Sequence, residues 1–338
     1  MTDTIHVLVL TQAPMPEPLL TSLRAVSPRV IVEHRNAETL EELGDVWQEV
    51  EVLYTTRLVP QPEAAPRLRW VQGHFAGVDQ ILGHPLLRGV ILTTSSGIHA
   101  PVMAEYSLMM ILAFAHRLPR MIEYQGRAEW PQQRWALFVP QELRDATIGI
   151  VGYGSIGRET ARLARAFGMR VLALKRHVDQ RIDDGWSLPN VGDAAGENVD
   201  RLFAPDQLHA MLAQCDYVVV AAPLTPETRG LLGAAEFKAM KREAVIINVA
   251  RGGVIDEAAM IDALRTRVIG GAALDVFEQE PLPADSPLWQ LPNVILSPHV
   301  SGFTPHYDER AMVLFAENLR RYVAGEPLLN VVDVKRGY

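Results

Sequence analysis

The sequence predicts an α/β protein in which a doubly wound domain with a parallel sheet is inserted into a smaller α/β domain. Two patterns predict this fold. Short apolar runs of strand type alternate with helical patterns along most of the chain, as βαβ units require. A glycine-rich turn at 152–157 lies between an apolar run and a helical pattern, which is the order of elements that opens a dinucleotide-binding domain.

The smaller domain is expected over residues 1–101 together with residues 302–338. Its first segment alternates apolar runs with helical patterns and has no glycine-rich phosphate-binding turn of its own. Strands are expected there at 6–10, 30–32, 52–54, 70–71 and 90–93. The second segment holds a helix at about 305–324, whose apolar residues are spaced to face a core: Met312, Phe315, Leu319 and Tyr322 or Val323.

The inserted domain is expected over residues 102–301. It begins with a long apolar helix at 102–117, and strand and helix patterns alternate from residue 147 to residue 300. The stretch 178–200 is rich in Asp, Gly, Asn and Pro, so we interpret it as a surface excursion. The expected strands are numerous enough for a full doubly wound sheet and lie at 147–151, 170–174, 217–222, 245–249, 269–274 and 294–297.

The turn at 152–157 reads G-x-G-x-x-G and predicts a site for a dinucleotide pyrophosphate. The first glycine permits a tight turn, the second lets the backbone approach the phosphates, and the third lets helix and strand pack closely. The N-terminus of the following helix faces the anion. We therefore expect cofactor contacts from Gly152, Tyr153, Gly154, Ser155, Ile156 and Gly157.

The residues after the next expected strand indicate which dinucleotide is preferred. A site that prefers NAD(H) usually places Asp or Glu there to bind the ribose 2′-hydroxyl. This chain has Lys175 and Arg176 instead, and arginine binds a 2′-phosphate with two parallel hydrogen bonds. We expect NADP(H) to be preferred, with NAD(H) possible. The alternative interpretation is an ordinary solvated basic pair at a strand end.

Composition excludes several classes of function. The 338 residues are 48% hydrophobic, enough for two domains with cores, and the net charge of −8 with no basic stripe argues against a nucleic-acid partner. The single cysteine, Cys215, excludes a disulfide framework and a cysteine-based metal cluster, and we expect no metal. No apolar run reaches membrane-spanning length, and the run at 5–10 is too short for a signal peptide, so we expect no membrane partner and a cytoplasmic location.

Three polar residues, each after an expected strand, form a candidate catalytic set. Arg251, Glu280 and His299 lie where strand ends face the ligand crevice of an open α/β sheet. Arginine can grip a carboxylate and polarise a carbonyl oxygen, and a protonated histidine can donate a proton as hydride reaches the carbon. Glutamate can orient the imidazole through its other nitrogen. These residues are the parts needed to reduce a 2-oxo acid.

With these motifs in view, the chain resembles the D-isomer-specific 2-hydroxyacid dehydrogenase family over nearly its whole length. The resemblance implies a Rossmann cofactor domain inserted in a smaller, flavodoxin-like substrate domain, with a cleft that closes over the substrate, and a homodimer. It also implies that Arg251, Glu280 and His299 are the catalytic residues. The matching segments are 152–157, 223–230, 248–253, 275–281 and 297–299.

The resemblance implies further contacts. Asp275 falls on the residue that accepts the nicotinamide carboxamide, although it could instead bind backbone N–H groups at its strand end. The segment 74–79 falls on the carboxylate-binding loop, where backbone N–H groups of Phe75, Ala76 and Gly77 would form an anion nest, in addition to Arg251. Other cofactor contacts are expected from the matching segments at Pro223, Thr228, Val249 and Ala250.

These features favour an NAD(P)-dependent enzyme that reduces a small 2-oxo acid, such as glyoxylate or hydroxypyruvate, to the D-2-hydroxy acid. Glu280 supports proton-coupled chemistry, because formate dehydrogenases, which resemble this family, carry glutamine there. A phosphoglycerate dehydrogenase-like enzyme is one alternative, although Phe75–Gly77 supplies no cation for a phosphate. The other is a nucleotide-gated dimeric binding protein, because corepressors that resemble this family can keep the catalytic residues.

Overall fold

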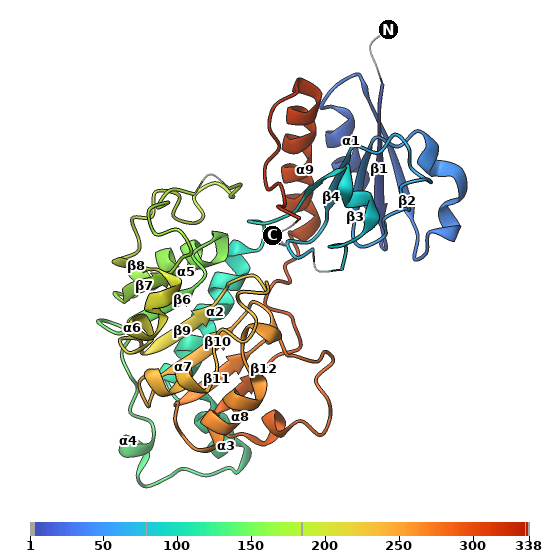
Figure 1. The fold of residues 1–338 in the computed structure, drawn as a ribbon. Helices are drawn as coiled ribbons and strands as arrows, with labels where there is room; N and C mark the ends of the chain where they lie inside the picture. The colour runs from blue at the N-terminus through green and yellow to red at the C-terminus, as the bar shows by residue number, and fades with distance from the viewer. Residues whose placement is uncertain (1–3, 79, 184, 335, 337–338) are drawn as a thin grey trace. The chain divides into compact units, whose positions relative to one another are not determined.

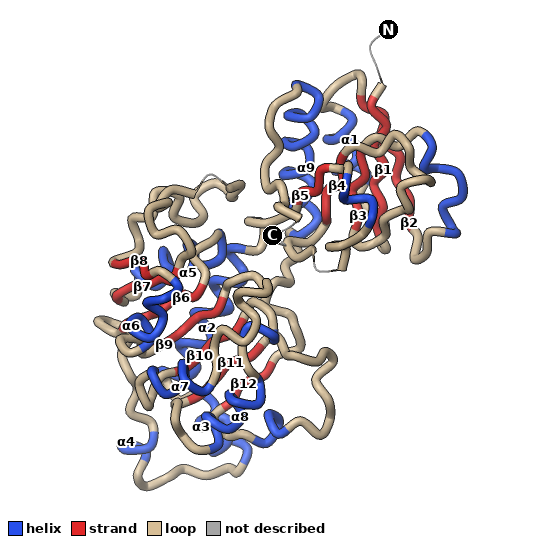
Figure 2. The backbone as a smooth tube through the Cα atoms, viewed as in Figure 1, coloured by secondary structure: helices blue, strands red, loops and turns tan. Residues whose placement is uncertain are grey.

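The computed structural model describes residues 4–78, 80–183, 185–334 and 336. The chain divides into two compact units, Met1–Ile98 with Thr304–Tyr338, and His99–Phe303. The sequence analysis placed the corresponding boundaries at 101/102 and 301/302. Each unit contains its own parallel sheet with helices packed against it, as Figures 1 and 2 show. Within the described residues, no helix is both long enough and apolar enough to cross a membrane.

The first unit is built on a five-stranded parallel sheet in the order β2-β1-β3-β4-β5. This is a flavodoxin-like order, in agreement with the flavodoxin-like domain that the family resemblance implied. Its strands are β1 (Ile5–Thr11), β2 (Val30–Asn36), β3 (Val52–Thr55), β4 (Trp70–Gly73) and β5 (Ile91–Thr93). Its helices are α1 (Glu17–Arg24) and α9 (Tyr307–Ala324), with 3-10 helices at Glu41–Gln48 and Pro85–Arg88.

The C-terminal helix α9 completes the core of the first unit and packs against α1 (Figure 1). Of the expected apolar positions, Met312, Phe315 and Leu319 are buried, and Tyr322 and Val323 are partly buried. The ring of Phe315 lies 5.0 Å from the ring of Tyr54 and 5.3 Å from that of Trp70, both on sheet strands. The helix ends where Gly325 adopts a left-handed conformation with φ of 70°. A segment more than 200 positions away in the chain therefore closes the core formed by residues 5–98.

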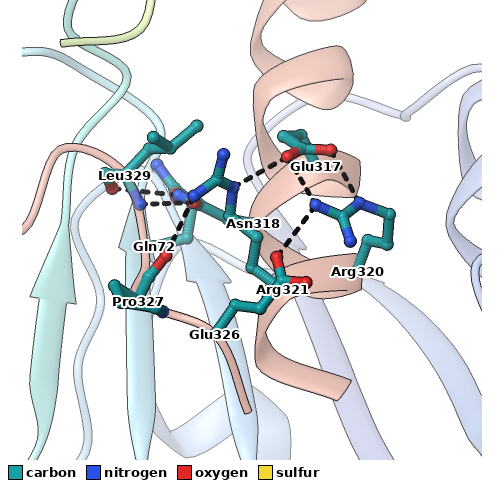
Figure 3. Close-up of polar contacts among 8 residues, drawn as sticks. All are labelled: Gln72, Glu317, Asn318, Arg320, Arg321, Glu326, Pro327 and Leu329. Atoms are coloured by element: carbon teal, nitrogen blue, oxygen red, sulfur yellow. Dashed lines mark hydrogen bonds and ion pairs between the residues drawn. The ribbon is translucent and has the colours of Figure 1, made fainter. Parts of the chain in front are cut away.

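A polar network at the end of α9 fixes the segment that follows the helix (Figure 3). The side chain of Asn318 is fully buried, accepts a hydrogen bond from the N–H of Leu329 at 2.8 Å and donates to the Leu329 carbonyl at 3.1 Å. It also donates to Gln72 on β4 at 3.3 Å. On the exposed side, Glu317 pairs with Arg320 at 2.9 Å and with Arg321 at 2.7 Å. The buried amide thus joins helix, sheet and following segment.

The second unit contains a seven-stranded parallel sheet in the order β12-β11-β10-β9-β6-β7-β8. Its strands are β6 (Thr147–Val151), β7 (Arg170–Leu174), β8 (Arg201–Phe203), β9 (Tyr217–Val220), β10 (Val245–Asn248), β11 (Gly271–Leu274) and β12 (Val294–Leu296). Every strand predicted in this unit is present. The sequence analysis missed β8, because a run of three residues that begins with arginine carries too little apolar pattern.

Helices pack against this sheet. The apolar helix predicted at 102–117 is α2 (Ala100–Ala115), which is mostly buried and packs against α5 (Ser155–Ala166) and β10. The remaining helices are α3 (Leu118–Gly126), α4 (Arg134–Leu137), α6 (Leu208–Leu212), α7 (Ala234–Ala239) and α8 (Glu257–Arg265), with 3-10 helices at Pro205–Gln207, Gly252–Val254 and Pro287–Gln290. The strand order reverses between β6 and β9, which is where a doubly wound sheet binds its ligand.

Replacing Asn318 with leucine tests the buried network of Figure 3. We expect the free energy of unfolding to fall by about 1–3 kcal/mol, because the N–H and carbonyl of Leu329 lose their partner inside the protein. Arg320→Ala is the matched control on the same helix, and an exposed ion pair of this kind contributes about 1 kcal/mol or less. Urea unfolding of both variants measures the difference, and equal losses would contradict the buried role of Asn318.

Candidate active site

The glycine-rich turn joins β6 to α5 at the point where the strand order reverses. Gly152 has φ of +102°, and a Cβ atom there would lie 2.6 Å from the backbone nitrogen of Ala222, after β9. A Cβ on Gly157 would lie 2.3 Å from the carbonyl oxygen of Gly152. Only glycine permits these approaches. The turn therefore brings the N-terminus of α5, at Ser155, to the carboxyl end of the sheet and forms a cradle that fits a pyrophosphate.

The second residue of the turn anchors the excursion at 178–200, a contact that the sequence analysis missed. The hydroxyl of Tyr153 donates to Asp193 at 2.5 Å, and the guanidinium of Arg158 lies 4.7 Å from the centroid of the Tyr153 ring. Arg158 is almost fully buried and also donates to the carbonyls of Asp193 and Arg181. The described part of the excursion is thus tied directly to the cofactor turn. The spacing of residues in the sequence does not reveal these contacts, because the residues that they join are more than 20 positions apart.

The two cations predicted to select the dinucleotide both have partners in the structure. Lys175 donates to the carbonyl of Gln180 in the excursion. Arg176 pairs with Glu227, and the nitrogen and oxygen atoms lie 3.8 Å apart. Hydrogen bonding from Thr225 and the nearby charge of Arg176 hold the pKa of Glu227 below its usual value. Arg176 therefore lies beside a carboxylate whose negative charge would repel a 2′-phosphate bound there.

Glu227 belongs to the loop after β9, in which the sequence analysis placed Pro223 and Thr228. The Thr228 hydroxyl donates to the Pro223 carbonyl at 2.6 Å and accepts from the N–H of Thr225 at 2.8 Å. The loop is closed by its own side chains. It begins beside Gly152, because Ala222 is the residue that a Cβ at that glycine would meet. This geometry places Pro223 next to the predicted cofactor turn.

Arg251 follows β10 and is held by its neighbours in the chain. The side chain of Asn248 accepts from the N–H of Ala250 at 3.1 Å and donates to the Arg251 carbonyl at 3.1 Å, and the N–H of Val249 donates to Val220 on β9 at 3.2 Å. The Arg251 guanidinium donates to the Ala250 carbonyl at 2.8 Å. The residue after the arginine must be glycine, since a Cβ there would lie 1.9 Å from the Phe277 carbonyl carbon. This contact fixes Arg251 against the segment that carries Glu280.

His299 and Glu280 form the central polar contact of the site. The Nδ1 atom of His299 lies 2.7 Å from Oε2 of Glu280, and Oε1 of the same carboxylate accepts from the N–H of Phe277 at 3.0 Å. The two side chains are 49% and 36% exposed, so both can be reached from solvent. Because Nδ1 is hydrogen-bonded to the Glu280 carboxylate, Nε2 is the ring nitrogen that can exchange a proton with another molecule.

The carboxylate of Asp275, which is 0% exposed at the end of β11, holds the loop that carries His299. Its Oδ1 accepts from the Ser297 hydroxyl at 2.6 Å and from the N–H of Val300 at 2.9 Å, and its Oδ2 accepts from the N–H of Ser301 at 2.9 Å. The N–H of His299 donates to the carbonyl of Asp275 at 2.9 Å. These contacts match the alternative that the sequence analysis left open for Asp275, binding of local N–H groups. Its role toward the nicotinamide stays a prediction.

A relay of hydroxyl groups reaches Asp275 from α2. Tyr106 lies 2.5 Å from the Ser297 hydroxyl, which in turn donates to Asp275. Burial raises the pKa of Tyr106 to about 12, so its hydroxyl stays protonated and donates to Ser297. The loop is thereby fixed from two elements, and it holds His299 at φ of 55°, a left-handed conformation that costs a non-glycine residue on the order of 1 kcal/mol.

The residues predicted to bind the substrate carboxylate lie in the first unit, directly after β4. Phe75 is half-exposed, and within the described part of the chain no acceptor takes a hydrogen bond from the N–H groups of Phe75, Ala76 or Gly77. Asp79, at the end of the matching segment, lies outside the described residues. The loop thus offers consecutive N–H donors, as an anion nest requires.

A family model described as "D-isomer specific 2-hydroxyacid dehydrogenase, NAD binding domain" matches residues 108–301. The glyoxylate reductase of Thermococcus gammatolerans is 36% identical over 282 residues, which cover 80% of this chain and 80% of that protein. The D-3-phosphoglycerate dehydrogenase of Methanocaldococcus jannaschii is 31% identical over 331 residues, which cover 96% of this chain but 59% of that protein.

Solved structures resemble the whole chain. A D-isomer specific 2-hydroxyacid dehydrogenase from Xanthobacter autotrophicus Py2, in complex with NADPH and MES, is 32% identical with a TM-score of 0.81. The NADPH-dependent glyoxylate/hydroxypyruvate reductase of Sinorhizobium meliloti, in complex with NADP and sulfate, is 30% identical with a TM-score of 0.79. Each match covers 99% of this chain and 100% of the other.

Removing the Asp275 carboxylate tests whether it holds the His299 loop. We expect Asp275→Ala to lower the free energy of unfolding by on the order of 3 kcal/mol, because two N–H groups and a hydroxyl lose a charged acceptor. Asp285→Ala, at an exposed position of the same unit, is the matched control and should change it by about 0.5 kcal/mol or less. Urea unfolding monitored by circular dichroism gives both values. A loss no larger than that of the control would contradict the assignment.

Proposed function

Because the chain belongs to the D-isomer specific 2-hydroxyacid dehydrogenase family, we propose that it reduces a small 2-oxo acid to the D-2-hydroxy acid with NADPH. The observation that best supports the proposal is the hydrogen bond between His299 Nδ1 and Glu280 Oε2 at 2.7 Å. This hydrogen bond leaves Nε2 as the nitrogen that can donate a proton to the substrate. Glyoxylate and hydroxypyruvate are the proposed substrates. The glyoxylate reductases and the glyoxylate/hydroxypyruvate reductase to which this chain is similar support that choice.

The second unit fits a dinucleotide at the turn between β6 and α5. Gly152 and Gly157 let the backbone there approach its neighbours too closely for any side chain, and the N-terminus of α5 lies at the same turn. The residues proposed to hold the cofactor are the turn at 152–157, the loop at Pro223–Thr228, the strand end at Val249–Ala250 and Asp275. When bound, the reduced nicotinamide supplies a hydride to the carbonyl carbon.

The proton that completes the reduction comes from His299. In its protonated form, the imidazole donates from Nε2 to the carbonyl oxygen as the hydride reaches the carbon, so a 2-oxo acid, a hydride and a proton give the 2-hydroxy acid. Glu280 holds the ring through Nδ1 and compensates the imidazolium charge before transfer. Arg251 polarises the carbonyl and binds the carboxylate, to which the N–H groups of Phe75–Gly77 also donate.

Preference for NADPH over NADH is the part of the proposal that rests on Lys175 and Arg176. Lys175 and Arg176 follow β7 directly, where a site that prefers NAD(H) usually carries Asp or Glu. The similar proteins solved in complex with NADPH and with NADP support this choice. Glu227 opposes it, since its carboxylate lies 3.8 Å from the Arg176 guanidinium. We therefore propose that the preference for NADPH is real but reduced by Glu227.

A homodimer is part of the proposal. An open apolar depression lies on α2, α3 and α5 of the second unit, lined by Leu108, Met109, Leu112, Leu118, Met121 and Phe167. Met109 and Phe167 are 52% and 44% exposed, so the depression presents apolar side chains of the kind that mark an interaction surface when they are contiguous. A second copy of this chain is the partner proposed to cover the depression, and sedimentation equilibrium would then give twice the mass of one chain.

The similarity to phosphoglycerate dehydrogenase supports a second candidate substrate class. The chemistry at the carbonyl would be the same, but a phosphorylated substrate calls for cations near its phosphate. The loop at Phe75–Gly77 supplies none. Initial rates of NADPH and NADH oxidation with glyoxylate, hydroxypyruvate, pyruvate and 3-phosphohydroxypyruvate separate the candidates. We expect turnover with the first two, and dominant turnover of the phosphorylated acid would overturn the choice.

Replacing His299 with alanine separates an enzyme from a nucleotide-gated binding protein. We expect kcat to fall by about 10²–10⁴-fold, because the proton donor is lost. The dissociation constant for NADPH should stay within about twofold, since the cofactor turn is untouched. His177→Ala, at an exposed position in the same unit, is the control and should keep full turnover. Retention of wild-type turnover by the His299 variant would contradict the assigned role.

Charge changes at the end of β7 test the cofactor preference. We expect Arg176→Ala to lower kcat/KM for NADPH by about tenfold or more with little effect on NADH, because one charged contact to the 2′-phosphate is lost. Glu227→Gln should shift the preference the other way, toward NADPH, by about two- to fivefold, since the opposing charge is exposed and screened. Measured ratios for NADPH and NADH that do not change in the Arg176 variant would refute the site.

A further inference from the structure

His74 has a place in the first unit that the assigned chemistry does not explain. It is the first residue after β4, directly before the N–H groups of Phe75, Ala76 and Gly77 that are proposed to bind the substrate carboxylate. None of the roles proposed for the reaction accounts for a buried histidine at the start of this loop. The side chain of His74 is nevertheless buried, at 10% exposure, and it is surrounded by groups from other elements.

The imidazole is held on several sides. Its Nδ1 atom lies 2.5 Å from the hydroxyl of Tyr54, which is completely buried on β3. The ring of Tyr307, at the start of α9, stacks on it with centroids 4.7 Å apart and an interplanar angle of 28°. Phe75 meets its edge at 4.7 Å. The histidine therefore joins a strand, the start of a helix and the loop itself in one aromatic cluster.

The backbone of the same segment is fixed as well. The N–H of His74 donates to Thr55 on β3 at 2.8 Å, and its carbonyl accepts from the Tyr307 hydroxyl at 3.2 Å. The carbonyl of Phe75 accepts from the N–H of Ser95 at 3.2 Å, and the Ser95 hydroxyl donates to the carbonyl of Gly73 at 3.0 Å. Because the carbonyls of residues 73–75 are all engaged, the peptide planes that carry the next N–H groups are restricted.

The imidazole keeps one charge state over the neutral range. Burial lowers the pKa of His74 to about 4, so the ring is neutral near pH 7. Burial also raises the pKa of Tyr54, which keeps its hydroxyl protonated. The carboxylate of Asp308 on α9 lies 3.9 Å from Nε2, which is too far for a hydrogen bond. The contact between Tyr54 and His74 is thus a neutral hydrogen bond that does not switch with moderate changes of pH.

We infer that His74 is a positioning residue that sets the orientation of the carboxylate-binding N–H groups of Phe75, Ala76 and Gly77 through its contacts with Tyr54 and Tyr307. The inference rests on the proposed function, because that function makes these N–H groups a substrate contact. His74 itself does not touch the reacting atoms. Its loss therefore weakens substrate binding more than the chemical step, and it leaves the cofactor site of the second unit unchanged.

The test compares His74→Ala with Tyr54→Phe, which removes one hydroxyl and keeps the ring. With NADPH and glyoxylate, we expect KM to rise about tenfold or more in His74→Ala and about two- to tenfold in Tyr54→Phe, with kcat within about threefold of wild type. The inhibition constant of oxamate, a carboxylate that is not reduced, should rise in parallel, and the dissociation constant for NADPH should not change. The double variant should be no worse than His74→Ala, because both residues share one hydrogen bond.

His34→Ala is the matched control. His34 lies on β2 of the same unit, is partly buried and makes a comparable contact, 3.0 Å to the hydroxyl of Thr11. Its KM for glyoxylate should equal that of wild type. A similar rise in the control, a fall in kcat with unchanged KM, or a KM within twofold of wild type in His74→Ala would overturn the inference. Should His74→Ala not fold, Tyr54→Phe decides by the same criteria.

Hydrogen–deuterium exchange separates this inference from the proposed function. We expect the amides of residue 74 and Ser95, whose hydrogen bonds fix the loop, to exchange about tenfold faster in His74→Ala than in wild type, with no change in peptides from the second unit. If the wild-type protein reduces no 2-oxo acid, the proposed function fails and exchange alone decides whether His74 positions the loop. Unchanged exchange at residue 74 and at Ser95 would overturn the positioning role whatever the activity.

Discussion

The buried carboxylate of Asp275 is the interaction on which the candidate site depends most. It takes hydrogen bonds from the Ser297 hydroxyl and from the N–H groups of Val300 and Ser301, while its own carbonyl binds the N–H of His299. A buried carboxylate is unfavourable unless its oxygens are satisfied, so its partners are held firmly. That restraint offsets the cost of the left-handed conformation of His299 and keeps Nδ1 against Glu280. The contact between His299 and Glu280 therefore depends on the Asp275 carboxylate, although Asp275 takes no part in the proposed proton transfer.

Parallel topology explains why the remaining groups of the second unit gather at one edge of the sheet. β6, β9, β10, β11 and β12 are all parallel, so the segments that follow them leave the sheet on the same side. Close approaches then fix the loops against one another, most clearly at Gly152 and Gly252, where no Cβ can be accommodated. Charge is a second factor, and it bears on the choice between NADPH and NADH. Arg176 and Glu227 carry opposite charges at the strand end where we propose that the dinucleotide is selected, so the proposed preference for NADPH depends on both groups.

The sequence predicted the features that depend on local pattern and missed those that depend on contacts between distant residues. All strands except β8, the helix α9 and the turn at 152–157 follow from apolar periodicity and glycine spacing, and the structure contains them. The short strand β8 has too few apolar residues to be recognised. The burial of Arg158, the contacts of Asp193 and the pairing of His74 with Tyr54 join segments that have no shared pattern in the sequence. Such contacts arise from tertiary packing, which spacing along one chain does not encode.

We propose that His299, oriented by Glu280, and a reduced nicotinamide together convert a 2-oxo acid to the D-2-hydroxy acid. Chiral analysis of the product formed from hydroxypyruvate and NADPH tests it most directly, because hydride and proton must be delivered to defined faces and atoms of one substrate. We expect D-glycerate as the sole product, formed in equal amount to the NADPH consumed. Formation of L-glycerate, or consumption of NADPH without glycerate, would contradict it.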